Sequence, residues 1–96
     1  MMSGKSIDQD TLDDWKERAV SFQLVDVRRT DERLTRHIGG IHIPLDEIIQ
    51  RRSEIRHGIP VVVYCRKGIR SQLAIQRLMQ IDPDLDLYNL TGGIGQ

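Results

Sequence analysis

The chain has 96 residues, of which 39% are hydrophobic, and its 14 basic side chains balance its 14 acidic ones. This length suffices for one domain with one core, and zero net charge gives no overall attraction to a polyanion. Aromatic residues make up only 4% of the chain, which argues against a nucleic-acid partner, and no apolar run is long enough to span a membrane. The single cysteine excludes an internal disulfide. We therefore expect one soluble domain over residues 1–96, in the cytoplasm, where a reduced cysteine persists.

The first part of the chain predicts two strands with a helix between them. Residues 5–7 favour a short edge strand, and a helix capped by Asp10 or Thr11 is expected to run to about Arg18. The apolar side chains that would share one face of this helix are Leu12, Trp15 and Ala19. Residues 22–27 are apolar and partly β-branched, which is typical of a buried strand.

The middle of the chain predicts a polar connection, a third strand and a second helix. Residues 28–36 are charged and favour a loop or a short exposed helix, and the glycines at 39–40 break the chain. Residues 41–43 alternate like a strand that ends at Pro44, and residues 45–56 favour a helix. The apolar residues assigned to one face of that helix are Leu45, Ile48, Ile49 and Ile55.

The last part of the chain predicts a strand, a helix and a final strand. Gly58 suits the end of the preceding helix, and residues 60–64 favour a buried strand. Residues 70–81 favour a helix, followed by a strand at residues 85–90. The predicted apolar stripe of the helix is Ala74, Leu78 and Ile81. Strands that alternate with helices predict an α/β fold, with a mostly parallel central sheet and helices on both faces.

The most informative segment is the loop between the strand at 60–64 and the helix at 70–81. It reads Cys65-Arg66-Lys67-Gly68-Ile69-Arg70. Backbone N–H groups of a strand-to-helix loop bind anions, and the dipole of the following helix adds to this effect. A lone cysteine is often only a small buried apolar residue, but this one is followed by three basic residues and a glycine. These neighbours favour the thiolate, so we interpret Cys65 as a nucleophile.

Polar residues also end the strand at residues 22–27. We interpret Asp26 and Arg28 as supporting residues that hold adjacent loops through hydrogen bonds or ion pairs, with Asp31 or Glu32 as the partner of Arg28. The histidines at positions 37 and 42 have no cysteine or glutamate at the spacing of metal ligands, so structural hydrogen bonding is expected for both. The sequence predicts no metal and no cofactor.

Four segments of the chain carry a family resemblance. They are Val25-Asp26-Val27-Arg28, His37-Ile38 with Gly40 to Leu45, Val62 to Ser71, and Leu90-Thr91-Gly92-Gly93-Ile94. In this order they resemble the corresponding segments of the rhodanese family of sulfurtransferases, and the cysteine loop is the most specific of the four. The resemblance implies a single rhodanese-like domain. Arg33 departs from the pattern, since the family usually has an apolar residue there.

The resemblance also implies a mechanism. Cys65 would take the outer sulfur of a donor as a persulfide, and the N–H groups of residues 66–70 would hold its charge. Arg66 and Lys67 would steer an anionic donor such as thiosulfate, and Arg70 would close the loop or contact the substrate. The expected partners are such a donor or a protein persulfide, together with a thiol or cyanide acceptor.

Two alternatives remain open at the level of sequence. The first is a phosphatase or arsenate reductase of the same fold. Phosphatases of this kind place five residues between cysteine and arginine, whereas four separate Cys65 from Arg70. The shorter loop favours a single sulfur atom over a tetrahedral oxyanion. The second alternative is a non-catalytic sulfur carrier or protein-binding module.

Overall fold

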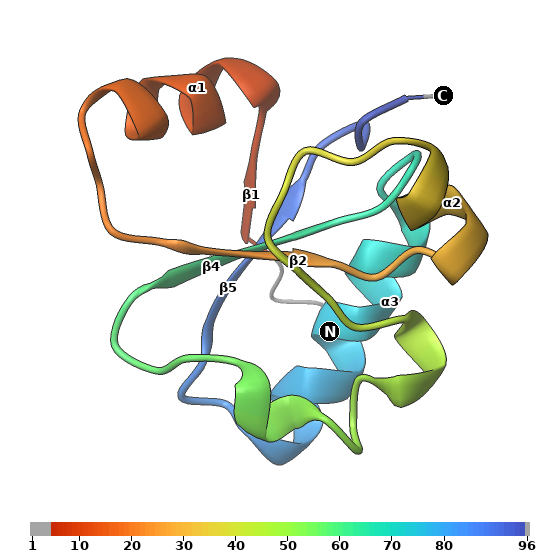
Figure 1. Ribbon diagram of the computed structural model, residues 1–96. Helices are drawn as coiled ribbons and strands as arrows, with labels where there is room; N and C mark the ends of the chain where they lie inside the picture. Colours follow the sequence, from red (N-terminus) through yellow and green to blue (C-terminus); the bar gives the residue numbers. More distant parts are fainter. Residues whose placement is uncertain (1–4, 96) are drawn as a thin grey trace.

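The computed structural model describes residues 5–95, which form a five-stranded, all-parallel sheet with helices on both faces (Figure 1). The strands are β1 (Lys5–Ile7), β2 (Gln23–Asp26), β3 (Ile41–His42), β4 (Pro60–Tyr64) and β5 (Asp86–Leu90). The helices are α1 (Gln9–Glu17), α2 (Thr30–Thr35) and α3 (Ile69–Ile81), with two 3-10 turns, η1 (Leu45–Glu47) and η2 (Arg52–Glu54). The strand order is β1-β5-β4-β2-β3, so the first strand pairs with the last. The predicted fold class is confirmed.

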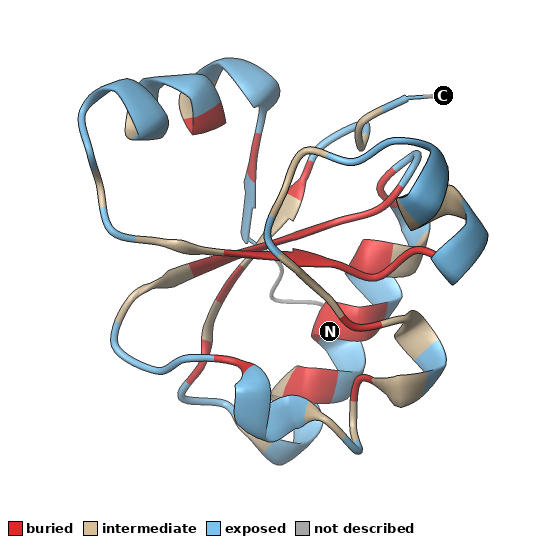
Figure 2. Cartoon of the chain, in the orientation of Figure 1, coloured by how far each residue is buried: buried red, intermediate tan, exposed pale blue. Residues whose placement is uncertain are grey.

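Strand β4 lies at the centre of the sheet because its side chains suit a strand that is buried on both faces. Val61, Val62 and Val63 are fully buried, and β-branched residues pack well on a pleated surface (Figure 2). The alternation of a strand divides the core between the two faces. Val61, Val63 and Cys65 belong to the cluster that packs under α3, while Val62 and Tyr64 belong to the cluster under α1. The chain therefore delivers Cys65 to the α3 face, at the carboxyl end of the central strand.

Helix α1 begins two to three residues earlier than the sequence predicted. Its N-cap is Asp8, whose Oδ1 accepts a hydrogen bond from the backbone N–H of Thr11 at 2.8 Å. Asp10 instead lies in the first turn, where a carboxylate favours the positive end of the helix. Leu12 is buried as expected, but the helix ends at Glu17 and Ala19 has a positive φ of 57°, so Ala19 is not part of the helical face.

The segment from 45 to 56 is not a continuous helix. Its apolar residues do pack inward as predicted, with Ile48 and Ile55 buried, but the backbone forms only the short turns η1 and η2. Its end is fixed by the side chain of Gln23, which donates to the carbonyl of Glu54 and accepts from the N–H of Arg56, both at 2.9 Å. These two hydrogen bonds to β2 hold the chain extended after Glu54, although the sequence pattern favours a helix there. Gly58 therefore follows no helix and is not a helix cap.

Helix α3 buries two of the three residues of the predicted stripe and two that were not predicted. Its buried residues are Ser71, Ala74, Ile75 and Leu78. Ile81, assigned to this stripe, is 48% exposed and does not belong to the buried face. None of the helices within residues 5–95 is long and apolar enough to cross a membrane.

Candidate active site

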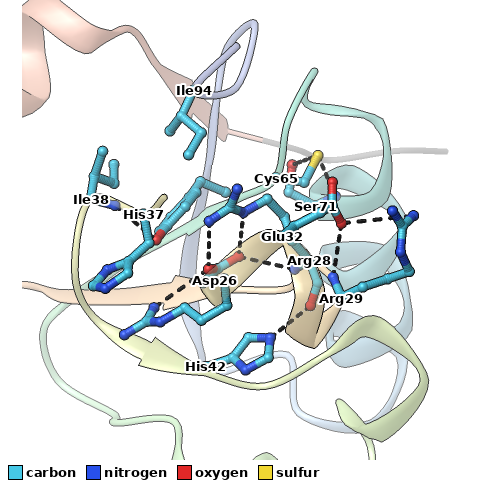
Figure 3. A network of polar contacts seen from close by, with 12 residues as sticks. Asp26, Arg28, Arg29, Glu32, His37, Ile38, His42, Cys65, Ser71 and Ile94 are labelled. Atoms are coloured by element: carbon cyan, nitrogen blue, oxygen red, sulfur yellow. Dashed lines mark hydrogen bonds and ion pairs between the residues drawn. The ribbon is translucent and has the colours of Figure 1, made fainter. Parts of the chain in front are cut away.

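The loop that carries Cys65 has the strand–loop–helix geometry expected for an anion site. Gly68 is the N-cap of α3, and its φ of 93° is a conformation that glycine adopts readily. This turn directs two backbone N–H groups at Sγ of Cys65, that of Gly68 at 3.0 Å and that of Ser71 at 3.4 Å. The cysteine is 1% exposed, so its sulfur meets these N–H groups largely away from water. Figure 3 shows Cys65 beside Ser71.

The surroundings of Cys65 act on its ionisation in opposite directions. Burial raises the pKa of the thiol, because a charged sulfur is poorly solvated there. The backbone N–H groups of Ser71, Lys67 and Gly68 lower it, as does the Ser71 hydroxyl when its proton faces Sγ, and together these contacts outweigh burial. The pKa of Cys65 therefore lies below its ordinary value.

Alkylation by iodoacetamide measures this property directly. We expect the pH midpoint for modification of Cys65 to lie below the free-thiol value of about 8.5, because only the thiolate reacts. The rate is followed by intact mass across a pH series, with a short cysteine peptide as the control. A midpoint at or above that of the peptide would contradict the lowered pKa.

Two residues that sequence reasoning did not assign complete the surroundings of the sulfur. The Ser71 oxygen lies 3.4 Å from Sγ, and its hydroxyl donates to Oδ1 of Asn89 at 2.5 Å. The amide nitrogen of Asn89 donates to the carbonyl of Gly68 at 3.1 Å. The only signal in the sequence is that Asn89 interrupts a largely apolar strand, β5, directly before the buried Leu90.

The segment after β5 forms backbone hydrogen bonds with the cysteine loop. The N–H of Ile94 donates to the carbonyl of Cys65 at 3.0 Å, and the N–H of Gly95 donates to that of Arg66 at 2.9 Å. Because these carbonyls are engaged on the outer side, the loop can direct its N–H groups inward. Gly93 allows the two segments to approach, since a Cβ there would lie 2.3 Å from the Arg66 oxygen.

Substitutions at two adjacent glycines distinguish how much stability depends on this close approach and how much depends on backbone strain. Gly92 and Gly93 both have positive φ, of 76° and 65°, but a Cβ on Gly92 meets nothing within 4 Å. We expect Gly92→Ala to cost about 1 kcal/mol of unfolding free energy, and Gly93→Ala to cost a further ~1–3 kcal/mol. Urea unfolding measures both. Equal losses would mean that the contact with the Cys65–Arg66 backbone contributes nothing.

All the predicted loop residues except Gly68 line one pocket, of about 290 Å³. Its walls are Cys65, Arg66, Lys67, Ile69 and Arg70. Within the described residues, the side chains of Arg66 and Lys67 are exposed and make no hydrogen bond or ion pair. Ile69 is 72% exposed. The pocket therefore combines an enclosed sulfur with a rim that carries two unpaired positive charges.

Arg70 differs from the other two basic residues because its charge is already paired. Its guanidinium donates to both carboxylate oxygens of Glu32 in α2, at 2.7 and 2.9 Å. These hydrogen bonds lower the pKa of Glu32 to about 2. The pair joins α2 to the start of α3, beside the cysteine loop.

Asp26 and Arg28 pair with each other, and the predicted pairing of Arg28 with Asp31 or Glu32 is wrong. The Arg28 guanidinium donates to the two Asp26 oxygens at 3.0 and 3.1 Å, with both side chains buried (Figure 3). Residues 26 and 28 lie on the same face of an extended chain, which brings them together. Asp31 and Glu32 instead contact Arg29.

The buried pair belongs to a larger network of hydrogen bonds that holds the segment from 36 to 42 in place. Arg28 also donates to the carbonyl of Arg36 at 2.5 Å, and its own carbonyl contacts Nε2 of His42 at 2.7 Å. Arg33 donates to the carbonyls of Gly39 and Gly40, at 3.2 and 2.8 Å, and lies 3.4 Å from Asp26. This explains how a charged residue occupies a position where an apolar one was expected.

The two histidines named above make structural contacts. Nδ1 of His37 accepts from the N–H of Gly39 at 2.9 Å, and His42 contacts the Arg28 carbonyl. Within residues 5–95, no group of three or more histidine, cysteine, aspartate or glutamate side chains is arranged to hold a metal ion.

Comparison with known proteins places this chain in a family. The model of the family described as Rhodanese-like domain matches residues 8–96. The uncharacterised protein YqhL of Bacillus subtilis is 43% identical over 72 residues, which cover 74% of this chain and 56% of YqhL. The adenylyltransferase and sulfurtransferase MOCS3 of Aedes aegypti is 32% identical over 97 residues, which cover 88% of this chain but 22% of MOCS3. The chain thus spans about half or less of these two relatives.

Solved structures agree with this placement. A rhodanese-like domain protein from Staphylococcus aureus superposes with a TM-score of 0.85 at 27% identity, and covers 94% of this chain and 87% of that one. A match of this quality over nearly the whole chain shows the same fold.

Proposed function

The chain belongs to the rhodanese-like domain family, and on this basis we propose that it is a sulfurtransferase that carries sulfane sulfur as a persulfide on Cys65. The observation that supports the proposal most directly is the geometry at Sγ. A buried cysteine, with a pKa below its ordinary value, is held against backbone N–H groups at the carboxyl end of the central strand. Parallel α/β sheets commonly bind their ligands at that edge.

The proposed transfer has two balanced steps. In the first step the Cys65 thiolate attacks the outer sulfur of thiosulfate, the sulfur–sulfur bond of the donor breaks, and sulfite leaves with the bonding electron pair. Cys65 is then an anionic persulfide, whose charge the N–H groups of the loop stabilise. In the second step cyanide or a thiolate attacks the outer sulfur, and the Cys65 thiolate leaves with the electron pair.

The loop favours sulfur over phosphate or arsenate as the group that is handled. Chemistry on a tetrahedral oxyanion uses an arginine that contacts the oxygens, whereas Arg70 gives two hydrogen bonds to Glu32. Four residues between Cys65 and Arg70 also make a smaller ring of N–H groups. Both features support a persulfide as the bound species.

Intact-protein mass spectrometry tests the proposal. After incubation with thiosulfate we expect the mass to increase by one sulfur atom, and cyanide should remove this sulfur with release of thiocyanate. If no sulfur is gained from thiosulfate or from a small-molecule persulfide, the proposed carrier role is wrong. Cys65-dependent turnover of an aryl phosphate without sulfur gain would replace it with oxyanion chemistry. Loading without transfer to cyanide or a small thiol would indicate a carrier that requires a protein partner.

Arg66 is proposed to attract the anionic donor. We expect Arg66→Ala to raise the KM for thiosulfate about twofold to fivefold, because an exposed cation contributes up to ~1 kcal/mol, and this difference should shrink at high salt. Arg56→Ala is the matched control, since it removes the same charge from an exposed residue before β4, at the other end of that strand. Equal KM values for the two variants would refute the steering role.

A further inference from the structure

Asn89 fixes the direction of a single proton next to the catalytic sulfur. Its amide nitrogen lies 3.1 Å from the carbonyl of Gly68, which can only accept. This contact requires the NH₂ group of the amide on that side, and therefore the oxygen Oδ1 on the side of Ser71. Oδ1 can also only accept, so at 2.5 Å the Ser71 hydroxyl must be the donor.

The consequence for Cys65 follows from the single proton that a hydroxyl group carries. Serine has one proton, and Asn89 receives it, so the atom that Ser71 presents to Sγ at 3.4 Å is an oxygen lone pair. A thiol can donate to that lone pair, but a thiolate cannot. The thiolate can recruit the Ser71 proton only if Asn89 Oδ1, next to a fully buried serine, loses its donor.

We propose that Asn89 is a positioning residue that competes with Cys65 for the hydroxyl proton of Ser71, and so disfavours the bare thiolate relative to the persulfide. The comparison with the persulfide rests on the function proposed above. In the persulfide the charge lies mainly on the outer sulfur, and Sγ no longer needs a hydroxyl donor. The Ser71–Asn89 hydrogen bond therefore opposes the thiolate without opposing the loaded form.

The charged groups around the sulfur do not supply this effect. They are Arg66 and Lys67 in the loop, Arg70 of α3 paired with Glu32 of α2, and the buried Asp26–Arg28 pair near the end of β2. From the side of β5 and the turn after it, residues 87–95 present no charged side chain. Asn89 thus acts on Cys65 through Ser71, and variants at these two positions leave every charge unchanged.

The test is a double-mutant cycle read by the pH midpoint of iodoacetamide alkylation of Cys65, in the wild type, Asn89→Ala, Ser71→Ala and the double variant. We expect Asn89→Ala to lower the midpoint by about one pH unit, the size of one charge-assisted hydrogen bond. In the Ser71→Ala background, Asn89→Ala should leave the pH midpoint of alkylation unchanged. Near-UV circular dichroism monitors folding, and Asn89→Ser, which is too short to make both contacts, replaces Asn89→Ala if the latter does not fold.

Two outcomes would overturn the inference. An upward shift in Asn89→Ala would mean that Asn89 assists the thiolate, and equal shifts in both backgrounds would mean that it acts only through Gly68. Alkylation needs no sulfur donor, so this result stands independently of whether a persulfide forms. If one does form, sulfite should strip sulfur from Asn89→Ala at about tenfold lower concentration than from the wild type, since one pH unit corresponds to a tenfold change.

Discussion

Replacing Cys65 with serine is expected to abolish sulfur loading, so that thiosulfate adds no mass to the variant and cyanide releases no thiocyanate from it. The hydroxyl is not ionised near neutral pH and forms no persulfide, so the loss should be ~10³-fold or more. The serine oxygen can still accept from the N–H groups of Gly68 and Ser71, which now approach Sγ at 3.0 and 3.4 Å. Thermal unfolding should therefore change by no more than the equivalent of about 1 kcal/mol.

The composition of the chain makes this a clean experiment. Cys65 is the only cysteine in the sequence, so no second thiol can take over the sulfur. Sulfur gain by Cys65→Ser would place the carrier atom elsewhere and refute the proposed function. A variant that unfolds would instead point to a structural role of the buried thiol, and the alkylation profile of the wild type would then carry the argument alone.

Replacing Asp26 with asparagine is expected to cause the largest loss of stability, about 3–5 kcal/mol of unfolding free energy. Asp26 and Arg28 are 0% and 3% exposed, so the variant retains a buried guanidinium with no charged partner in the described structure except the more distant Glu32. Arg33 also loses its contact with Asp26. Urea unfolding at neutral pH measures the effect.

The control is an ion pair of the same chemistry at the surface. Arg29 and Asp31 have side chains that are 68% and 71% exposed, so Asp31→Asn should leave the free energy of unfolding almost unchanged. Adding Arg28→Met to Asp26→Asn removes the unpaired charge and should recover part of the loss. A loss as small as that of Asp31→Asn would show that the buried pair does not stabilise the fold.

The same pair predicts how stability depends on pH. Burial opposes the ionisation of Asp26, but hydrogen bonds from Arg28 and Arg33 outweigh it, so its pKa lies below the ordinary value. A group with a lowered folded pKa stabilises the protein fully above its unfolded value, about 3.9, and less as the pH falls through the folded value. The difference between the wild type and Asp26→Asn should therefore be largest above about pH 5 and shrink in acid.

The cysteine loop was predictable because its signal is local. A β-branched run, a cysteine, a glycine and an amphipathic run follow one another within a short segment, and the structure has β4, the loop and α3 in that order. The expectation that Val62, Val63 and Tyr64 lie in the core is also confirmed.

The features that the sequence did not predict depend on contacts between distant residues. One example is the pair of hydrogen bonds between Gln23 and the backbone of Glu54 and Arg56, which joins residues more than thirty positions apart. These bonds end the helical pattern that the sequence shows over residues 45–56. Asn89 reaches Ser71 only because β5 lies next to β4 in the sheet. The partner of Arg28 was missed for another reason: acidic residues lie on both sides of it, and only the alternation of the extended chain selects Asp26.

The hydrogen bonds from residues 94 and 95 to the cysteine loop have a consequence for the order in which the protein folds during its synthesis. The loop carbonyls are held by the last described residues, and β5 must insert between β1 and β4 before the sheet is complete. A ribosome releases the chain from its N-terminal end, so a nascent chain that has exposed Cys65 still lacks both elements. Until those residues arrive, the carbonyls of Cys65 and Arg66 lack the N–H groups of Ile94 and Gly95 that hold them in the folded protein. The cysteine loop therefore reaches its final geometry only when β5 and the turn after it are in place.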